Sequence, residues 1–549
     1  MSVADTFKTA GSGSTYRLLI KELLNTALTH LPEQEIVYRD LSRYRYGTLR
    51  ERVGQLAGGL AMLGVSPGDT VAMMDWDSHR YLECFFAVPM MGAVLQTVNV
   101  RLSPEQILYT LNHAGADVLM FNAEFAPVVS AIRANLETVR KFVLLNDSDA
   151  VPEVPVDVEY ETMLAMADPE FAFPEFDENA RATTYYTTGT TGVPKGVYFS
   201  HRQLVLHTLA QLAAFGCAGR QGRFHRDDVY MPITPMFHAH AWGFPYGATM
   251  LGVKQVYPGR YAPDTLLGLI EKERVTFSHC VPTILQMLLA SPIIDRVDLR
   301  AWKVVIGGAA LSTTMARAAL ARGIDVFSGY GMSETCPCLT VAHLRTPMLD
   351  SSMDRQVAMR ARTGFPMPLV DLRAVDETMT DVPHDGRAVG EVVVRAPWLT
   401  QGYWKNEEAS RQLWVGGYLH TGDIGNIDGE GYLQVTDRIK DVIKSGGEWI
   451  SSLQIEELVA RHEAVSEVAV ISFKDQRWGE RPLALVVSKP GLVGATSPEQ
   501  IIAHVRTFAD QGMISRFAVP ERVVFVDALA RTSVGKIDKK ALRLKYGTA

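Results

Sequence analysis

The stretch of sequence best suited to chemistry is a loop rich in glycine and hydroxyl side chains at residues 185–196 (YYTTGTTGVPKG). Its glycines allow several backbone N–H groups to point into one concavity, and the threonine hydroxyls and the Lys195 ammonium add further donors. Such a concavity suits an anion. The loop therefore predicts a site for a ligand that carries phosphate.

This loop differs from the two commonest nucleotide-binding motifs. The P-loop pattern GxxxxGK[ST] would need glycine at Pro194 and serine or threonine at Gly196, and no GxGxxG occurs anywhere in the chain. A solvated linker of small residues is the alternative interpretation, but linkers rarely combine TGTTG with PKG. We therefore expect a phosphate site of another kind.

The loop resembles the phosphate-binding signature of the adenylate-forming enzymes, which include acyl-CoA synthetases, firefly luciferases and the adenylation domains of peptide synthetases. Thr188 stands where serine is more common and keeps the hydroxyl. The resemblance implies that ATP is the ligand, that Thr187 and Lys195 take part in catalysis, and that Thr187 also lies at a Mg²⁺ ion. In this loop it assigns ATP binding to Thr187, Thr188, Gly189, Thr190, Thr191 and Lys195.

Two further stretches occur in the order expected of that superfamily. Residues 307–310 (GGAA) would let a flat ring lie against the backbone, and the resemblance places adenine there. In residues 329–335 (GYGMSET) it implies that Tyr330 stacks on adenine and that Glu334 holds Mg²⁺, an ion that prefers carboxylate and phosphate oxygens. Read alone, Glu334 would be a surface charge. The nucleotide-binding residues assigned here are Gly308, Ala309, Ala310, Gly329, Tyr330, Gly331 and Thr335.

A third stretch, residues 418–423 (YLHTGD), ends in an aspartate. The two oxygens of a carboxylate can each accept a proton from one hydroxyl of a vicinal diol, so Asp423 suits a ribose. A solvated turn would be the simpler interpretation of Asp423 alone. The resemblance implies that Asp423 and Arg438 both reach the ribose and that Lys440 is a hinge.

Near the C-terminus, residues 531–539 (RTSVGKIDK) place a lysine beside a glycine. A carboxylate that attacks a polyphosphate experiences like-charge repulsion, which an ammonium at the reacting oxygens relieves. The resemblance implies that Lys536 is this catalytic lysine. It also implies that residues 442–452 (VIKSGGEWISS) border coenzyme A, through Lys444, Gly446, Gly447, Glu448 and Trp449.

The block at residues 235–246 (PMFHAHAWGFPY) is expected to contact the acid. No aspartate or glutamate lies between Tyr230 and Tyr261, and an amino-acid substrate would need a carboxylate opposite its ammonium. We therefore expect an acid with an apolar tail. We place His238 among the catalytic residues. The resemblance to medium- and long-chain fatty acyl-CoA synthetases makes Trp242 the gate of the acyl tunnel, with a core aromatic as the alternative.

Composition limits the classes of partner. The 549 residues include 54 basic and 61 acidic side chains, a net charge of −7, which disfavours nucleic acid and anionic membranes as partners. The five cysteines are scattered, which is typical of reduced thiols in a cytoplasmic protein. The longest apolar run, residues 84–98, is too short to span a bilayer, so we expect no integral membrane segment. A homodimer is left open.

The order of elements predicts an α/β fold. Apolar runs at residues 71–74, 117–121 and 141–145 indicate buried strands, and the amphipathic segments 51–63 and 104–113 indicate helices. Parallel strands are expected from this alternation. Further strands are expected at residues 276–280, 303–306, 325–327, 468–473, 483–488 and 522–526, and a helix at 498–508.

We divide the chain into a large N-terminal body and a small C-terminal domain. Residues 1–436 form layered sheets and helices with a β-rich subdomain after residue 390 and bind AMP and the acyl group. Residues 437–441 form the hinge, and residues 442–549 form a mobile α+β cap that carries Lys536.

The combined motifs predict an ATP- and Mg²⁺-dependent ligase that converts an apolar carboxylic acid to its CoA thioester through acyl-AMP. Medium- or long-chain fatty acids are favoured. The alternatives are a short thioether acid of the methylthio-propionate type, an aryl acid, or an enzyme that loads a carrier protein. An oxygenase similar to luciferase and a non-enzymatic nucleotide-binding protein are less consistent with the motifs.

Overall fold

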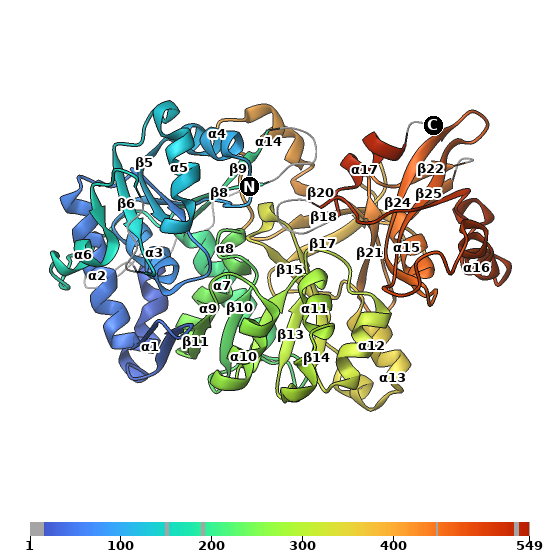
Figure 1. The fold of residues 1–549 in the computed structure, drawn as a ribbon, viewed down its shortest axis with the longest axis horizontal. Helices are drawn as coiled ribbons and strands as arrows, with labels where there is room; N and C mark the ends of the chain where they lie inside the picture. The colour runs from blue at the N-terminus through green and yellow to red at the C-terminus, as the bar shows by residue number, and fades with distance from the viewer. Residues whose placement is uncertain (1–15, 149–152, 188–192, 446–447, 532–536, 548–549) are drawn as a thin grey trace, which may run out of the picture.

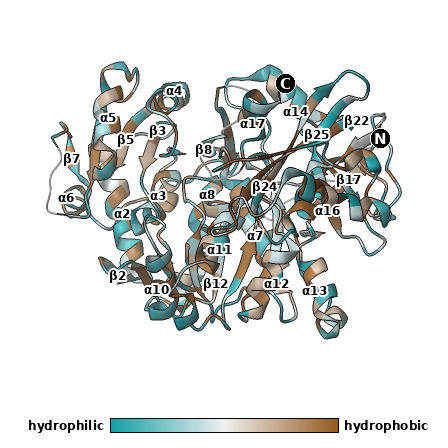
Figure 2. Cartoon of the chain, turned by 45° about the vertical axis from the view of Figure 1, so that its right-hand side comes forward, coloured by the Kyte–Doolittle hydropathy of each residue, from teal (hydrophilic) through white to brown (hydrophobic). Residues whose placement is uncertain are grey.

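This computed structural model describes residues 16–148, 153–187, 193–445, 448–531 and 537–547, and these residues form four β-sheets. The sheets follow one another along the chain except that the first two strands belong to the second sheet. Figure 1 shows the N-terminal sheet and its helices at the left and the C-terminal sheet at the right. Hydrophobic residues concentrate on strands such as β24, as Figure 2 shows. Among the described residues, no helix combines the length and the hydrophobicity needed to cross a bilayer.

The N-terminal sheet has seven strands, parallel except for one antiparallel edge pair. Its central strands are apolar and buried, as expected for a sheet covered by helices on both faces. In spatial order they are β7 (Val158–Glu159), β6 (Lys141–Leu145), β5 (Ala116–Asn122), β3 (Thr70–Met74), β4 (Val94–Thr97), β8 (Arg181–Thr187) and β9 (Lys195–Ser200). The helices that accompany this sheet are α2 (Tyr46–Met62), α3 (His79–Met90), α4 (Pro104–Ala114), α5 (Ala126–Ile132) and α6 (Tyr160–Ala165).

The second sheet has nine strands, and its centre is again parallel. In order they are β16 (Phe365–Pro366), β15 (Cys338–Val341), β14 (Asp325–Gly331), β13 (Lys303–Ile306), β12 (Phe277–Cys280), β10 (Val229–Ile233), β11 (Lys254–Tyr257), β1 (Glu35–Tyr38) and β2 (Ser42–Arg45). The associated helices are α1 (Asn25–His30), α7 (His201–Gly216), α8 (Ala239–Trp242), α9 (Phe244–Leu251), α10 (Pro263–Glu273), α11 (Pro282–Leu289), α12 (Thr313–Ala321) and α13 (Met353–Arg360).

Two five-stranded sheets complete the chain. The first contains β17 (Asp371–Val375), β18 (Gly390–Arg395), β20 (Tyr418–Ile427), β19 (Trp414–Val415) and β21 (Leu433–Arg438), with α14 (Glu407–Leu413) between β18 and β19. The second contains β23 (Glu448–Ile450), β22 (Ile443–Ser445), β25 (Gly479–Ser488), β24 (Val465–Asp475) and β26 (Arg522–Phe525), with helices α15 (Ser452–Ala460), α16 (Pro498–Asp510) and α17 (Lys539–Tyr546).

Helix boundaries follow from capping residues in the sequence. In α7, Ser200 accepts a hydrogen bond from the backbone N–H of Gln203, whose side chain accepts from the Ser200 N–H in return. Helix α4 has the same capping box at Ser103, and it ends at Gly115, whose φ of +72° costs glycine little. These local signals explain why α4 and α16 begin at the predicted residues.

The α/β fold class with a smaller C-terminal sheet domain is confirmed, and β6 and β13 have the predicted bounds. One local expectation differs from the structure. Helix α14 interrupts the expected run of short strands, because Asn406 caps a polar segment that has no apolar stripe of its own. The predicted phosphate loop connects β8 and β9, the antiparallel pair at one edge of the N-terminal sheet.

The predicted hinge coincides with the passage from one sheet to the next. Strand β21 ends at Arg438 and β22 begins at Ile443. Beyond this point the chain has hydrophobic clusters of its own, built around residues such as Ile443, Val470 and Leu542. The division at residues 437–441 and the mobility of the cap stay predictions.

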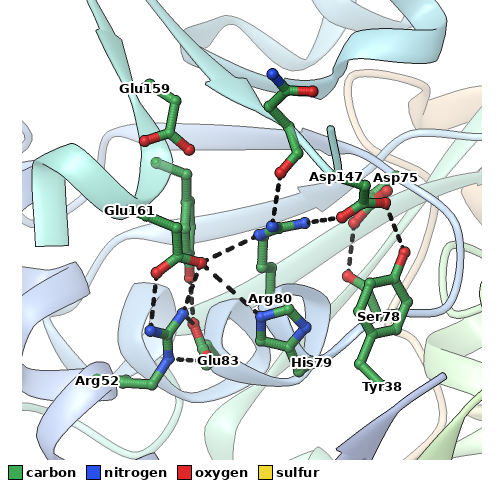
Figure 3. A network of polar contacts seen from close by, with 12 residues as sticks. Tyr38, Arg52, Asp75, Ser78, His79, Arg80, Glu83, Asp147, Glu159 and Glu161 are labelled. Atoms are coloured by element: carbon green, nitrogen blue, oxygen red, sulfur yellow. Dashed lines mark hydrogen bonds and ion pairs between the residues drawn. The ribbon is translucent and has the colours of Figure 1, made fainter. Parts of the chain in front are cut away.

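A buried network of ion pairs joins helices of the N-terminal sheet to the second sheet (Figure 3). Glu83 on α3 has no exposed side-chain surface, and it accepts hydrogen bonds from Arg52 Nε at 2.7 Å and from the hydroxyls of Tyr44 at 2.7 Å and Tyr160 at 2.6 Å. Arg52 also pairs with Glu161 at 2.8 Å. The buried carboxylate of Glu83 thus satisfies one buried donor, Tyr160, and two partly buried donors, Tyr44 and Arg52.

We expect Glu83→Ala to lower the free energy of unfolding by roughly 2–4 kcal/mol, because the hydroxyls of Tyr44 and Tyr160 lose their acceptor and Arg52 keeps only its pair with Glu161. Chemical denaturation measures this change. The control is Asp298→Ala, which breaks an exposed pair with Arg300 and should leave the midpoint almost unchanged. Equal effects of the two substitutions would contradict the prediction.

Candidate active site

All four sheets contribute residues to one cavity of about 1320 Å³. It lies at the ends of β8 and β9, of β13 and β14, and of β20 and β21, and α15 and α17 complete its wall. The predicted site residues that line it are Thr187, Lys195, His238, Trp242, Gly308, Ala309, Ala310, Gly329, Tyr330, Gly331, Glu334, Arg438 and Lys440. The structure therefore brings together motifs from most of the chain.

Asp423, the predicted ribose residue, lies directly behind two of these lining side chains. The Tyr330 hydroxyl donates to its Oδ2 at 2.6 Å, and Arg438 Nε lies 3.1 Å from its Oδ1. Asp423 and Arg438 face each other as a cross-strand pair of β20 and β21. Each carboxylate oxygen has one donor and keeps further lone-pair capacity, so the group can still accept from a diol.

The end of the cavity where phosphate is predicted to bind is built on the β8–β9 pair. Thr187 and Lys195 are opposite each other in the register, and the Lys195 ammonium lies 4.7 Å from the ring centre of Tyr403. The Tyr403 hydroxyl donates to Glu334 Oε1 at 2.7 Å. Thr188, Gly189, Thr190 and Thr191 lie outside the described residues.

Tyr403 was missed by the sequence analysis. It follows glycine in the short segment between β18 and α14, and its backbone forms an isolated bridge to Val197 of β9. The glycine and aromatic residues at 402–404 are the only local feature of the sequence that could have pointed to Tyr403 as a site residue. This signal does not reveal that the ring lies between Lys195 and Glu334, because both come from other sheets.

Glycines shape the opposite end of the cavity. A Cβ on Gly307 would lie 3.0 Å from the carbonyl oxygen of Gly329 and 2.9 Å from the ring of Trp242, and a Cβ on Gly331 would lie 1.8 Å from the Pro337 oxygen. Flat, backbone-lined surfaces therefore arise where adenine was predicted. The predicted binding residue Thr335 does not line this surface, since its hydroxyl donates to carbonyl oxygens of its own loop.

The segment that carries Trp242 has unusual backbone geometry. Four successive residues, Ala239–Trp242, have φ between +45° and +58°, a left-handed turn that costs L-residues roughly 1–2 kcal/mol each. The turn is held by His240 Nε2, 2.8 Å from the Thr183 hydroxyl, and by Gln211 Nε2, which donates to the Trp242 oxygen at 3.0 Å. Burial lowers the pKa of His240 to about 3, so its ring is neutral and is held by Thr183. Trp242 both borders the cavity and belongs to the core.

A buried carboxyl group supports the neighbouring loop that carries His238. Asp77 accepts hydrogen bonds from the Met236 N–H at 2.8 Å and from the Tyr261 hydroxyl. Burial raises the pKa of Asp77 to about 8. No local pattern indicates this contact, because Asp77 resembles any turn residue after a strand.

On the C-terminal side, Lys539 lies in a buried polar cluster. Its Nζ donates to the Ser452 hydroxyl at 2.6 Å and lies 2.7 Å from Glu456 Oε1, while Asp437 Oδ2 accepts from the Ser452 N–H at 2.6 Å. This cluster ties the predicted hinge to α15 and α17. Burial and the neighbouring Arg438 lower the pKa of Lys440.

The remaining predicted residues divide into two groups. Lys444 is exposed on β22, does not line the cavity, and donates its backbone N–H to Glu480. Glu448 and Trp449 belong to the backbone of β23, whereas Gly446, Gly447 and Lys536 lie outside the described residues. Arg531 and Ile537, which flank residues 532–536, both line the cavity.

Comparisons with known proteins agree with this architecture. The model of the AMP-binding enzyme family matches residues 24–404, and that of the AMP-binding enzyme C-terminal domain matches residues 454–536. The chain belongs to the AMP-binding enzyme family.

Relatives of this AMP-binding enzyme include proteins named for CoA ligation. It is 41% identical to a long-chain-fatty-acid–CoA ligase of Thermus thermophilus, over 96% of this chain and 95% of that protein. It is 36% identical to a 3-methylmercaptopropionyl-CoA ligase of Ruegeria lacuscaerulensis, over 98% and 99%. The ATP-bound structure of MatB from Rhodopseudomonas palustris matches with a TM-score of 0.82 at 25% identity, covering 97% of this chain and 99% of MatB.

We expect Tyr403→Phe to reduce turnover of this AMP-binding enzyme by roughly tenfold or more, because a hydrogen bond to a charged group contributes about 1.5–3 kcal/mol. The ring beside Lys195 is retained, so the change isolates the hydroxyl that positions Glu334. Steady-state rates at varied ATP measure it. The control is Tyr418→Phe, which removes an exposed hydroxyl bonded to Asp371. Wild-type rates for Tyr403→Phe would refute the positioning role.

We expect Asp77→Asn to change how stability depends on pH. Because the folded pKa is about 8, the folded protein holds a proton on Asp77 that the unfolded chain lacks between roughly pH 4 and that value. The free energy of unfolding contributed by this group therefore falls as the pH rises through the window, by at most about 1.4 kcal/mol per pH unit.

Denaturation of wild type and Asp77→Asn across this pH range measures the difference in slope. The exposed carboxylate of Asp264 at the start of α10 provides the control, because Asp264→Asn should keep the wild-type slope. Identical slopes for wild type and Asp77→Asn would contradict the assignment.

Proposed function

We propose that this protein is an ATP- and Mg²⁺-dependent acyl-CoA synthetase that acts on an apolar carboxylic acid. One observation carries the proposal. A single cavity is lined by the ends of the predicted phosphate loop, by Tyr330 and Arg438 with Asp423 held directly behind them, and by the acyl-side residues His238 and Trp242. Nucleotide and acid can therefore meet in one place.

In the first step, the carboxylate of the acid attacks the α-phosphorus of ATP and pyrophosphate leaves, which gives acyl-AMP. Thr187 and Lys195 bind the phosphates, and Asp423 with Arg438 binds the ribose. Gly308, Ala309, Ala310, Gly329, Tyr330 and Gly331 border the adenine. Lys536 stabilises the charge that gathers between the carboxylate and the phosphate.

Mg²⁺ fits the oxygen donors at the phosphate end. Glu334 lines the cavity, and Tyr403 fixes the orientation of its carboxylate. Carboxylate and hydroxyl oxygens together with phosphate oxygens suit this ion, so Glu334 and Thr187 are the residues that would hold it. The ion would neutralise charge on the departing pyrophosphate.

In the second step, the thiol of coenzyme A attacks the acyl carbonyl carbon and AMP leaves. The cap turns about Lys440, and the 444–449 segment then borders the pantetheine arm. In the arrangement described here, Lys444 lies away from the cavity whereas Arg531 and Ile537 line it, which fits the first step. The five cysteines are unpaired, in keeping with a cytoplasmic enzyme.

The acid has an apolar tail. Phe215, Trp242, Val281, Val305 and Val341 line the cavity on the acyl side, and no carboxylate occurs between Tyr230 and Tyr261. A short thioether acid is the second candidate substrate, because the Ruegeria relative is named for 3-methylmercaptopropionate. Loading of a carrier protein is distinguished by comparing AMP release with CoA and with a phosphopantetheinyl carrier.

We expect Lys536→Ala to abolish formation of acyl-AMP from acid and ATP, because the like-charge repulsion is no longer relieved. Conversion of supplied acyl-AMP to the CoA thioester should persist. Pyrophosphate release and thioester formation measure the two half-reactions separately. Lys545→Ala, at an exposed position on α17, is the control and should retain both. Equal loss of both half-reactions in Lys536→Ala would overturn the assigned role.

A further inference from the structure

Phe215 borders the cavity from within the protein core. It lies near the end of α7, its side chain is buried, and it lines the cavity together with Val305, Val341 and Trp242. The lining residues on the nucleotide side, such as Ala309, are more exposed. Phe215 therefore belongs to the wall furthest from solvent, on the side where the acyl tail is expected.

A shell of aromatic rings backs Phe215. Its ring centre lies 5.2 Å from that of Phe244, 5.8 Å from Phe277 and 5.1 Å from His343, all in edge-on geometry. Phe327 lies 6.3 Å away. These four rings are buried or nearly so, and none lines the cavity. Edge-to-face contacts of this kind stabilise one ring orientation.

The rings behind Phe215 are packed so closely that its side chain cannot move away from the cavity. A Cβ on Gly222 would lie only 2.4 Å from the Phe327 ring and 2.9 Å from His343, so even one added carbon does not fit behind the shell. Phe277 is in turn stacked on Phe224 with ring centres 4.4 Å apart. Well-packed interiors of this type resist displacement of one ring without movement of several.

The register of α7 sets the depth of the pocket. Gln211 on this helix contacts the Trp242 carbonyl oxygen, and Phe215 follows four residues later, which is about 6 Å along the helix axis. Along the axis of α7, Phe215 therefore lies about one helical turn from the residue that contacts the Trp242 turn. Only a few methylene groups fit in that length.

We propose that Phe215 is the closed end of the acyl pocket and that it limits the enzyme to short- and medium-chain apolar acids. The inference rests on the proposed acyl-CoA synthetase function and narrows its substrate class. It runs against a direct transfer of chain length from the Thermus relative, which is named for long-chain fatty acids.

The test measures kcat/KM for CoA thioester formation with butanoate, hexanoate, octanoate, dodecanoate and hexadecanoate. We expect wild type to lose roughly tenfold or more between octanoate and hexadecanoate, since a misfit in an apolar pocket discriminates by about this much. Phe215→Ala should raise the hexadecanoate-to-octanoate ratio by roughly tenfold, and Phe215→Trp should lower the octanoate-to-butanoate ratio.

Phe224→Ala is the matched control, because it removes a buried ring of the same cluster that does not line the cavity. It should lower stability but keep the wild-type ratios. Equal use of octanoate and hexadecanoate by wild type would overturn the proposal, and so would equal shifts in Phe215→Ala and Phe224→Ala. If Phe215→Ala fails to fold, Phe215→Trp tests the proposal by itself, and an octanoate-to-butanoate ratio that is not lowered overturns it.

Thioester formation with an unchanged chain-length profile in the Phe215 variants refutes only the role of Phe215. Absence of AMP release with every acid in wild type refutes the proposed function as well.

Discussion

The carboxylate of Asp423 is the interaction on which the arrangement of the cavity depends. Tyr330 reaches it from the nine-stranded sheet, and Arg438 reaches it from the strand that leads to the C-terminal sheet. A buried carboxylate is costly unless its oxygens are paired, so the two donors and the acceptor fix one another. The relative position of three segments is therefore set by one charged group.

A second buried cluster sets where the C-terminal sheet meets the rest. Burial raises the pKa values of Asp437 and Glu456, and the Lys539 ammonium opposes this effect at both. Ser452 links the lysine to Asp437. Because Asp437 lies within the predicted hinge, a rotation of the cap must keep or exchange these contacts. The electrostatic cost of breaking them would favour a few defined orientations over free movement.

The acyl side follows a different principle, because shape rather than charge decides it. The left-handed turn at Ala239–Trp242 is strained, and it is kept by hydrogen bonds from His240 and Gln211 in the core. Phe215 is held by rings that come from β12, β14 and α9. The proposed nucleotide end is thus organised by paired polar groups, and the proposed acyl end by close packing.

The sequence by itself determined the fold class, the order of the motifs and many element bounds. These features depend on local signals such as the apolar run of β6 or the capping box of α4, which act over a few residues. Short motifs, which are also local, led to thirteen of the residues that line the cavity. The local signals failed at α14, whose start depends on one capping asparagine, and they did not indicate that the Thr335 hydroxyl turns back into its own loop.

Only the tertiary structure decided which other residues serve the site. Tyr403 and Glu334 are 69 residues apart in the sequence, and Asp77 and Met236 are 159 residues apart. No local sequence pattern therefore predicts either contact. The proposed end of the acyl pocket likewise depends on rings from three elements that meet behind Phe215. A motif identifies the chemistry that a residue type can perform, because that chemistry belongs to the side chain. The positions of the site side chains and the volume of the cavity depend on how distant segments pack against one another. They are therefore defined only in the folded chain.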